Sequence, residues 1–340
     1  MPFFERKLMK FTMTQGICDE GMVRLKDRIP GVKIFIANNQ DPNNYLDEMR
    51  DTDAIIVRVA KCDGNAIENS PELKVIGRTG VGYDSVDVKK ATELGIPVII
   101  TPGANSRSVA EHAVAMMLSL SKSLYEYQVA MIKGNWEIRN ARKAFEFEGK
   151  NVGILGMGAI GREVCKMTQG LGMTVLGYDP FLSQEKIEAL GAKYFQNYEE
   201  LLQESDFVTV HVPLTEETRG MISMKQMKTM KKSAIVINCS RGGIIDEKDL
   251  YEALTNNVIR GAGLDVFDDE PVDPNNQLLK LENVVLSPHS AAQTQEAVIK
   301  MAQMCVDGCI AVLQGKKWPY VADKAVYNNS KWLGKEWAEL

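Results

Sequence analysis

The sequence predicts an α/β protein built from two doubly wound parallel sheets. Short apolar runs rich in Ile and Val alternate with polar, helix-like stretches, a pattern typical of parallel strands joined by helices. A long helical segment that begins near residue 106 interrupts this alternation, which resumes at Lys150. The chain has 340 residues, enough for two domains of ordinary size.

The first region, up to residue 105, is predicted to form a flavodoxin-like layer of five strands separated by helices. Its last helix is expected to end at Gly95 and Pro97, since both residue types stop helices. The predicted strands are 8–13, 32–37, 53–59, 73–76 and 97–100. The predicted helices are 20–28, 45–49 and 86–94.

A nearly charge-free helix is predicted from Ser106. Ser108 and Glu111 have the spacing of a capping box, and apolar side chains recur at helical intervals at positions 113, 116, 117 and 120. A helix that is apolar on most faces is buried, which suits a connector packed between two domains. We therefore place the domain boundary near residue 105.

The second region is predicted to form one larger doubly wound sheet. Its expected strands are 151–155, 174–178, 207–211, 234–238, 261–266 and 284–287. A final helix is expected over 295–313, followed by a tail that contains Trp318, Trp332 and Trp337. Three tryptophans are too many for a solvated segment, so the tail is expected to pack back on the first domain. The predicted domains are 1–105 plus 296–340, and 106–295.

Charge and hydropathy exclude several classes of partner. Forty Lys and Arg against 45 Asp and Glu leave a net charge of −5, with no basic block for a nucleic acid. No apolar run approaches the ~18 residues of a membrane span, and the first ten residues carry charges where a signal peptide needs apolar side chains. We expect a cytoplasmic protein that binds neither nucleic acid nor membrane.

The six cysteines are scattered without any Cys-x-x-Cys spacing. Cys305 and Cys309 would share one face of a helix, yet no nearby His or second Cys pair completes a set of four ligands. Buried free thiols are expected, and no metal site is predicted.

A glycine motif follows the strand predicted at 151–155. Gly156, Gly158 and Gly161 have dinucleotide-binding spacing, with Ala159 and Ile160 opening a helix between them. The first glycine permits a tight turn, the second lets the backbone approach a pyrophosphate, and the third lets helix and strand lie close.

Asp179 ends the next predicted strand, about 20 residues after the glycine motif, where a ribose-binding acid belongs. Its carboxylate can accept a hydrogen bond from a ribose 2′-hydroxyl and would repel a 2′-phosphate, and no Lys or Arg follows at once. NAD is therefore predicted rather than NADP. The alternative is that Asp179 is a helix-capping or surface residue.

The chain has only three histidines, which narrows the search for a proton-transfer group. His289 lies just past the end of a predicted strand, where ligands bind in open parallel sheets. His211 also ends a strand and is expected to line the adenosine pocket. His112 lies on the buried helix, where a hydrogen-bonded structural role is the simpler interpretation.

Two other strand ends carry groups that the oxidation of a hydroxy acid would use. Arg241 offers a planar fork for a substrate carboxylate. Glu270 could stabilise an imidazolium and orient it. Arg241, Glu270 and His289 at successive strand ends form a coherent catalytic set, although each alone could be a surface residue.

These motifs together resemble the D-isomer-specific 2-hydroxyacid dehydrogenases, over nearly the whole chain. The segments that carry the resemblance are 78–84, 105–106, 110–112, 156–161, 238–243, 265–271 and 288–289. The resemblance implies that His289 donates and accepts the proton, that Glu270 is its carboxylate partner, and that Arg241 holds and polarises the 2-oxo acid. It also implies a nucleotide domain inserted into a substrate domain, and a homodimer joined through the nucleotide domains near Trp136.

Within the family the motifs are most similar to the phosphoglycerate dehydrogenases. Arg58 and Lys61 would face a phosphate, but Val59 stands where a serine is usual. No regulatory serine-binding domain is expected. The expected substrate contacts are Arg58, Lys61, Arg78, Gly80, Val81, Gly82, Asn105, Arg241 and His289. The expected cofactor contacts are Gly156, Gly158, Ala159, Ile160, Gly161, Asp179, His211, Pro213, Cys239, Arg241, Asp265, His289 and Ala291.

Three alternatives to a phosphoglycerate dehydrogenase remain open. The first is a glyoxylate or hydroxypyruvate reductase, which uses the same residues on an unphosphorylated acid. The second is an NAD-sensing corepressor-like binding protein, which shares the fold and the catalytic set. The third is a formate dehydrogenase, which needs no acid and base of the Glu270 and His289 type.

Overall fold

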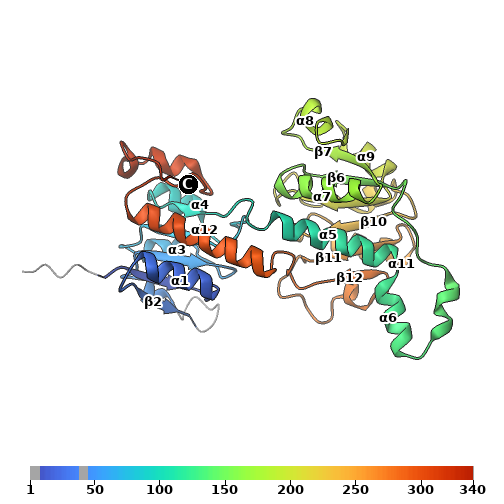
Figure 1. Cartoon of the computed structure of the whole chain (residues 1–340), viewed down its shortest axis with the longest axis horizontal. Coiled ribbons are helices and arrows are strands. Elements are labelled where there is room, and N and C mark those ends of the chain that lie inside the picture. Colours follow the sequence, from blue (N-terminus) through green and yellow to red (C-terminus); the bar gives the residue numbers. More distant parts are fainter. Residues whose placement is uncertain (1–7, 38–44, 340) are drawn as a thin grey trace, which may run out of the picture. The chain divides into compact units, whose positions relative to one another are not determined.

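The structure is a computed structural model that describes residues 8–37 and 45–339. It divides into two compact units: unit 1 takes in the described residues up to Asn105 and from Thr294 onward, and unit 2 is Ser106–Gln293. Both units are α/β layers around a parallel sheet, so the predicted fold class is confirmed (Figure 1). The sequence analysis placed the boundaries between the two domains at residues 105 and 295, and the units divide after Asn105 and after Gln293.

Unit 1 contains a five-stranded sheet in the order β2-β1-β3-β4-β5, the flavodoxin-like order. All its pairings are parallel. Every side chain of the central strand β3 is buried, as expected for a strand covered by helices on both faces. The strands are β1 (Lys10–Met13), β2 (Lys33–Ile36), β3 (Ala54–Val57), β4 (Val75–Arg78) and β5 (Val98–Ile99).

The helices of unit 1 are α1 (Asp19–Arg28), α2 (Leu46–Met49), α3 (Gly64–Glu68), α4 (Val88–Glu93) and α12 (Gln295–Leu313). Helix α12 returns from the end of unit 2 and packs against α1 and β4. Gly77 of β4 makes this approach possible, because a Cβ there would lie 2.6 Å from the Sγ atoms of both Cys305 and Cys309. These two thiols are buried and unpaired.

The C-terminal tail packs on unit 1, as predicted. It contains η4 (Lys324–Asn328) and η5 (Ser330–Trp332). The indole Nε1 of Trp332 donates to the Gly95 carbonyl at 2.9 Å, and Val321 bridges Ile99 of β5. Trp318 and Trp332 are buried, whereas Trp337 stays half exposed.

Unit 2 contains a seven-stranded parallel sheet in the order β12-β11-β10-β9-β6-β7-β8. Strands β6 to β11 are arranged in the strand order of the Rossmann fold, and β12 extends the sheet beyond β11. The six predicted strands are present, and the edge strand β8 was missed because it has only two residues. The strands are β6 (Asn151–Leu155), β7 (Thr174–Tyr178), β8 (Lys193–Tyr194), β9 (Phe207–Val210), β10 (Ile235–Asn238), β11 (Gly261–Leu264) and β12 (Val284–Leu286).

The long predicted helix is α5 (Ser106–Ser121), and it packs on α7 and against β10, β11 and β12 within unit 2. The predicted capping box is wrong. Ser108 lies inside the helix and its hydroxyl donates to the Ala291 carbonyl at 2.5 Å, while Glu111 pairs with Arg107. The other helices of unit 2 are α6 (Leu124–Ile132), η2 (Trp136–Ala141), α7 (Ala159–Gly170), α8 (Gln184–Glu188), α9 (Tyr198–Glu204), α10 (Met224–Met227), α11 (Glu247–Thr255) and η3 (Gln277–Lys280).

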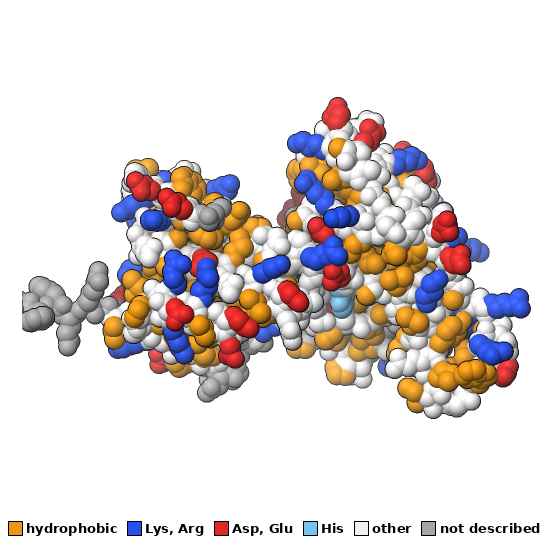
Figure 2. All heavy atoms as spheres, viewed as in Figure 1, with side chains coloured by type: hydrophobic (Ala, Val, Ile, Leu, Met, Phe, Trp, Pro, Cys, Tyr) orange, Lys and Arg blue, Asp and Glu red, His pale blue; other side chains and the backbone are white. Residues whose placement is uncertain are grey.

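Helix α6 and the segment η2 extend away from the sheet of unit 2 (Figure 1). Large hydrophobic side chains are exposed along both, including Ile132 at 78% and Trp136 at 60%, and Figure 2 shows hydrophobic side chains gathered at this end. Within the described ranges, no helix combines the length and apolar character needed to cross a bilayer.

Candidate active site

Three adjacent strands of unit 2 position the predicted catalytic residues. Arg241 follows β10, Glu270 follows β11 and His289 follows β12. The three strands are parallel neighbours, so their carboxyl ends meet at one edge of the sheet, where open α/β sheets bind ligands.

His289 and Glu270 form a direct pair. The Nδ1 of His289 lies 2.6 Å from Oε2 of Glu270, and the other carboxylate oxygen accepts the Phe267 amide at 3.1 Å. An ionised carboxylate only accepts hydrogen bonds, so Nδ1 carries the proton. The second ring nitrogen, Nε2, is then the atom available to a substrate.

Glu270 stays ionised at neutral pH. Burial favours its neutral form, but the hydrogen bond and positive charge of His289, the Phe267 amide and the positive charge of Arg241 outweigh burial and lower the pKa of Glu270 below its usual value. Arg241 lies in the neighbouring loop, whose Gly242 contacts the backbone of Phe267 in the loop that carries Glu270. The structure therefore brings all three predicted catalytic residues together.

The loop that carries Arg241 is braced by two residues that the sequence analysis did not single out. Asn238, at the end of β10, donates from its side chain to the Arg241 carbonyl at 2.8 Å and accepts the Ser240 amide at 3.0 Å. Gly242 touches the next loop, since a Cβ there would lie 2.0 Å from the Phe267 carbonyl oxygen. The sequence signal that could have identified Gly242 is its place directly after Arg241 in the motif 238–243.

The glycine motif forms a cradle that fits a dinucleotide. Gly156 has φ +94°, and a Cβ there would lie 2.6 Å from the His211 carbonyl oxygen. Gly161 lets α7 approach β6, because its Cβ would meet the Gly156 carbonyl oxygen at 2.1 Å. A Cβ on Gly158, by contrast, would meet nothing within 4 Å. The space is therefore open at the amino end of α7, where Ala159 and Ile160 begin the helix and where a pyrophosphate is stabilised.

Asp179 immediately follows β7, beside this cradle. Its two carboxylate oxygens accept the Met157 and Phe181 amides, both at 2.9 Å. These bonds orient the carboxylate, and each oxygen keeps a lone pair for a ribose hydroxyl. A role in holding the ribose stays a prediction.

The remaining predicted cofactor residues of unit 2 lie at the same edge. Burial lowers the pKa of His211 to about 3, so its ring is neutral at physiological pH. Burial raises the pKa of Cys239, whose thiol lies against Met116, and so favours the protonated thiol. Pro213 follows β9 in an exposed stretch, while Asp265 and Ala291 are buried beneath the His289 loop.

Unit 1 carries the other predicted substrate residues at the carboxyl edge of its own sheet. Arg78 ends β4, and its guanidinium donates to the Thr79 carbonyl at 2.6 Å. The Gly80 amide donates to the Arg78 carbonyl at 2.9 Å. In the part of the chain that the structure describes, the amides of Val81 and Gly82 have no hydrogen-bond acceptor, so these two are available to a carboxylate.

Three more predicted substrate residues belong to unit 1. Arg58 and Lys61 follow β3 and flank Val59, which is 49% exposed. The Oδ1 atom of Asn105 is buried and has no hydrogen-bond partner among the described residues. Their contacts with a substrate stay predictions.

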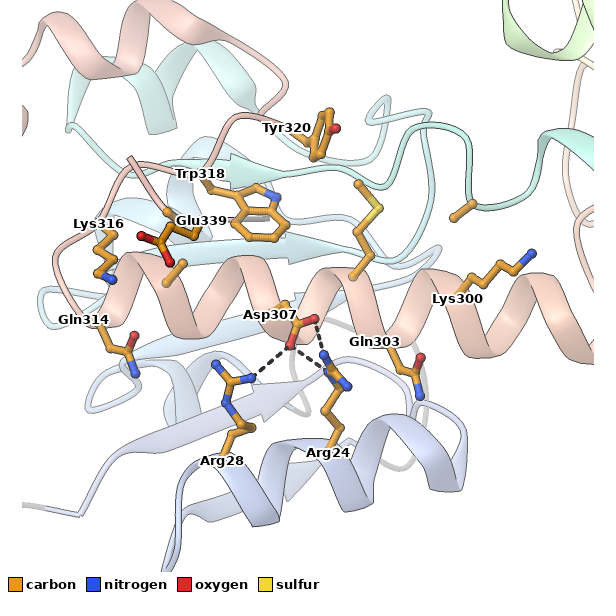
Figure 3. A pocket seen from close by; sticks show the side chains of 14 residues that line it. Arg24, Arg28, Lys300, Gln303, Asp307, Gln314, Lys316, Trp318, Tyr320 and Glu339 are labelled. Atoms are coloured by element: carbon orange, nitrogen blue, oxygen red, sulfur yellow. Dashed lines mark hydrogen bonds and ion pairs between the residues drawn. The ribbon is translucent and has the colours of Figure 1, made fainter. Parts of the chain in front are cut away.

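A separate cavity of about 670 Å³ lies in unit 1 between α1, α12 and the C-terminal tail (Figure 3). Arg24 pairs with Asp307 there at 2.7 Å, and Trp318 and Tyr320 form part of the wall. None of the predicted catalytic, cofactor or substrate residues lines this cavity. No cluster of three or more His, Cys, Asp or Glu residues suited to a metal occurs within 8–37 and 45–339.

Comparisons with known proteins agree with this geometry. The family model described as "D-isomer specific 2-hydroxyacid dehydrogenase, NAD binding domain" matches residues 114–291. The D-3-phosphoglycerate dehydrogenase of Methanocaldococcus jannaschii is 40% identical over 91% of this chain, which spans only 58% of that relative. The glyoxylate reductase of Korarchaeum cryptofilum is 39% identical, over 92% of this chain and 96% of its own length. The crystal structure of the TT0316 protein from Thermus thermophilus superposes with a TM-score of 0.86 at 30% identity, covering 93% of this chain and 100% of that one.

Proposed function

This chain belongs to the D-isomer specific 2-hydroxyacid dehydrogenases and carries the NAD-binding domain of that family, and we propose that it interconverts a 2-oxo acid and a D-2-hydroxy acid. The observation that carries the proposal is the pairing of His289 with an ionised Glu270 beside Arg241. Bound NAD supplies the hydride acceptor for oxidation, and NADH supplies the hydride donor for reduction.

Side chains of this protein stabilise the charge that develops on the substrate and transfer the proton. Glu270 holds the Nδ1 side of the His289 ring, so Nε2 gives its proton to the forming alkoxide in reduction and takes it back in oxidation. Arg241 supplies a positive fork that orients the 2-oxo acid and stabilises charge on its oxygens. The free amides of Val81 and Gly82 would hold the substrate carboxylate.

The cradle at the start of α7 would hold the cofactor. The open space at Gly158 leaves room for the pyrophosphate, and the carboxylate of Asp179 would accept a ribose 2′-hydroxyl. The same carboxylate would repel a 2′-phosphate. We therefore expect NADH to be used in preference to NADPH.

His289→Asn tests the acid assignment. The substitution removes the proton donor and keeps a polar side chain, so kcat for NADH-dependent reduction should fall at least about 100-fold. NADH affinity, measured by fluorescence, should stay within about twofold of the unmodified protein, because affinity rests mainly on the glycine cradle. Retained turnover would show that another group supplies the proton. Negligible turnover of every acid by the unmodified protein, with NADH-dependent capture of a protein partner, would instead support the corepressor-like alternative.

We propose a phosphorylated 2-oxo acid as the first candidate substrate, because Arg58 and Lys61 place two cations near the carboxyl edge of unit 1. The second candidate is a small unphosphorylated acid such as glyoxylate or hydroxypyruvate. It is favoured by Val59, whose exposed apolar side chain stands beside these cations. The glyoxylate reductase named above also matches this chain over nearly its full length.

A substrate panel decides between the two. The rate of NADH oxidation is measured with 3-phosphohydroxypyruvate, hydroxypyruvate, glyoxylate, pyruvate and a branched 2-oxo acid. If the phosphate is bound as proposed, Lys61→Gln raises KM for the phosphorylated acid and leaves KM for glyoxylate unchanged. A preference for glyoxylate that Lys61→Gln does not alter would exclude the first candidate.

We also propose that two copies of the chain associate through unit 2. Contiguous exposed apolar side chains mark association surfaces, and α6 and η2 carry Leu124, Tyr125, Met131, Ile132 and Trp136. Sedimentation should find a dimer that Ile132→Asp dissociates. A monomer at micromolar concentration would contradict this.

The cytoplasm is the proposed location. All six cysteines are unpaired, five of them buried, which fits a reducing compartment. Cell fractionation checks this proposal, and recovery in a membrane or secreted fraction would contradict it.

A further inference from the structure

Asp265 is the central acceptor beneath the loop that carries His289. Only 1% of this residue is exposed. Its Oδ1 accepts the Ser290 amide at 2.8 Å and its Oδ2 accepts the Ala291 amide at 2.9 Å. Its backbone carbonyl accepts the His289 amide at 2.7 Å. One buried residue at the end of β11 therefore binds three successive amides of the loop.

The loop needs this support because His289 has φ +49°, in the left-handed region that non-glycine residues rarely adopt. A non-glycine residue in this region is strained and persists only when its surroundings hold it there. The backbone conformation sets the direction of the imidazole toward Glu270. Contacts that hold the loop therefore also hold the proton donor.

Helix α5 adds two contacts, one on each side of His289. The Oγ of Ser108 donates to the Ala291 carbonyl at 2.5 Å, and Nε2 of His112 lies 2.8 Å from the Oγ of Ser287. Ser108 and His112 are four residues apart, so they share one face of the helix. Ser108 therefore contacts the loop from inside the helix, on the same face as His112, and does not cap the start of α5.

The direction of the His112 contact follows from counting protons. The hydroxyl of Ser287 has one proton, which it donates to Oδ1 of Asp265 at 2.5 Å. Its oxygen must then accept a hydrogen bond, which the N–H group at Nε2 of His112 donates. A chain of two hydrogen bonds thus runs from α5 through Ser287 to the carboxylate beneath the loop.

From these contacts we infer that Ser108 and His112 of α5 are positioning residues for the reaction: they clamp the loop on both sides of His289 and keep its imidazole aligned with Glu270. The inference rests on the proposed function, since it assumes that His289 transfers the proton. It assigns His112 a role in turnover, whereas the sequence suggested only a structural one.

The kinetic test measures kcat of matched variants with one substrate, the acid of the panel that the unmodified protein reduces fastest. His112→Leu removes the donor at similar volume, and Ser287→Ala removes the relay hydroxyl. Each should lower kcat about 10- to 100-fold, because a misplaced catalytic group costs that much, while NADH affinity is unchanged. His112→Gln and Ser287→Thr keep a donor and a hydroxyl, so both should restore most of the lost turnover. The double variant His112→Leu with Ser287→Ala should lose little more than either single variant.

Ser121→Ala serves as the control for general weakening of α5, because Ser121 is buried on the same helix and donates to the Leu118 carbonyl, away from the loop. It should lower Tm without changing kcat. If His112→Leu behaves like this control, or if the losses of the two single variants simply multiply, the clamp is refuted. If His289→Asn itself keeps full activity, the assignment of His289 as proton donor fails instead, and if the unmodified protein reduces no acid of the panel the proposed function fails, so these failures are distinguishable.

A second readout needs no substrate. Because the chain has only three histidines, long-range proton–nitrogen NMR spectra can resolve each ring. We expect a proton on Nε2 of His112, and shifts of the His289 ring signals in Ser108→Ala and Ser287→Ala while the His211 signals stay in place. Unmoved His289 signals in both variants would overturn the inference.

Discussion

Gly242→Ala tests whether the proposed catalytic groups depend on the close approach of two loops. A Cβ on residue 242 would lie 2.0 Å from the Phe267 carbonyl oxygen and 2.6 Å from the Asp268 amide nitrogen. Real Cβ atoms stay at least 3.0 Å from such atoms, and backbone cannot swing aside like a side-chain end. The two loops must therefore separate by about 1 Å, and they carry Arg241 on one side and Glu270 on the other.

A displacement of about 1 Å can cost about 100-fold in rate. We expect kcat for NADH-dependent reduction to fall by about 10- to 100-fold, with NADH affinity nearly unchanged because the glycine cradle lies on other strands. The assay is NADH absorbance at saturating acid, with NADH fluorescence for affinity and circular dichroism for the fold. Gly170→Ala is the matched control, since a Cβ there meets nothing within 4 Å. A folded Gly242→Ala protein with kcat within twofold of the control would refute the reasoning.

Three further predictions follow from the geometry. Gly158→Ala should leave Tm unchanged, since a Cβ there meets nothing within 4 Å, yet weaken NADH binding at least about tenfold in a fluorescence titration, because the methyl group enters the space predicted for the pyrophosphate. His211 stays neutral down to a pKa of about 3, whereas the unfolded chain takes up a proton near pH 6.5; stability should therefore fall with decreasing pH between these values, by up to about 1.4 kcal/mol per pH unit. Urea unfolding from pH 7 to 4 should show a weaker dependence in His211→Gln, and parallel profiles would count against this assignment. Gly77→Ala should destabilise unit 1 by about 1–3 kcal/mol, and by less when Cys305 and Cys309 are both alanine; equal losses in the two backgrounds would contradict the packing.

Local patterns in the sequence predicted most of the fold and the residues that meet at the candidate active site. Strand periodicity and the glycine motif are local signals, because the pleat and the tight turn are set by neighbouring residues. Parallel strands end at a common edge, so the order of Arg241, Glu270 and His289 along the chain indicated one site. Strand β8 escaped notice because two residues carry too little periodicity to detect.

Only the tertiary structure decided how the residues of the candidate active site are held. The spacing of Ser108 and Glu111 predicted a cap, but the Ser108 hydroxyl instead found the carbonyl of Ala291, distant in sequence and adjacent in space. The bond from His112 to Ser287 likewise joins residues that no local pattern relates. The pairing of His289 with Glu270 was expected, and the structure decided that Nδ1 is the ring nitrogen that faces the carboxylate. The sequence by itself determined the elements and the chemistry at their ends, because backbone propensity and residue type are local properties. The partner of each buried polar group depended on which chain segments folding brings within about 3 Å of each other.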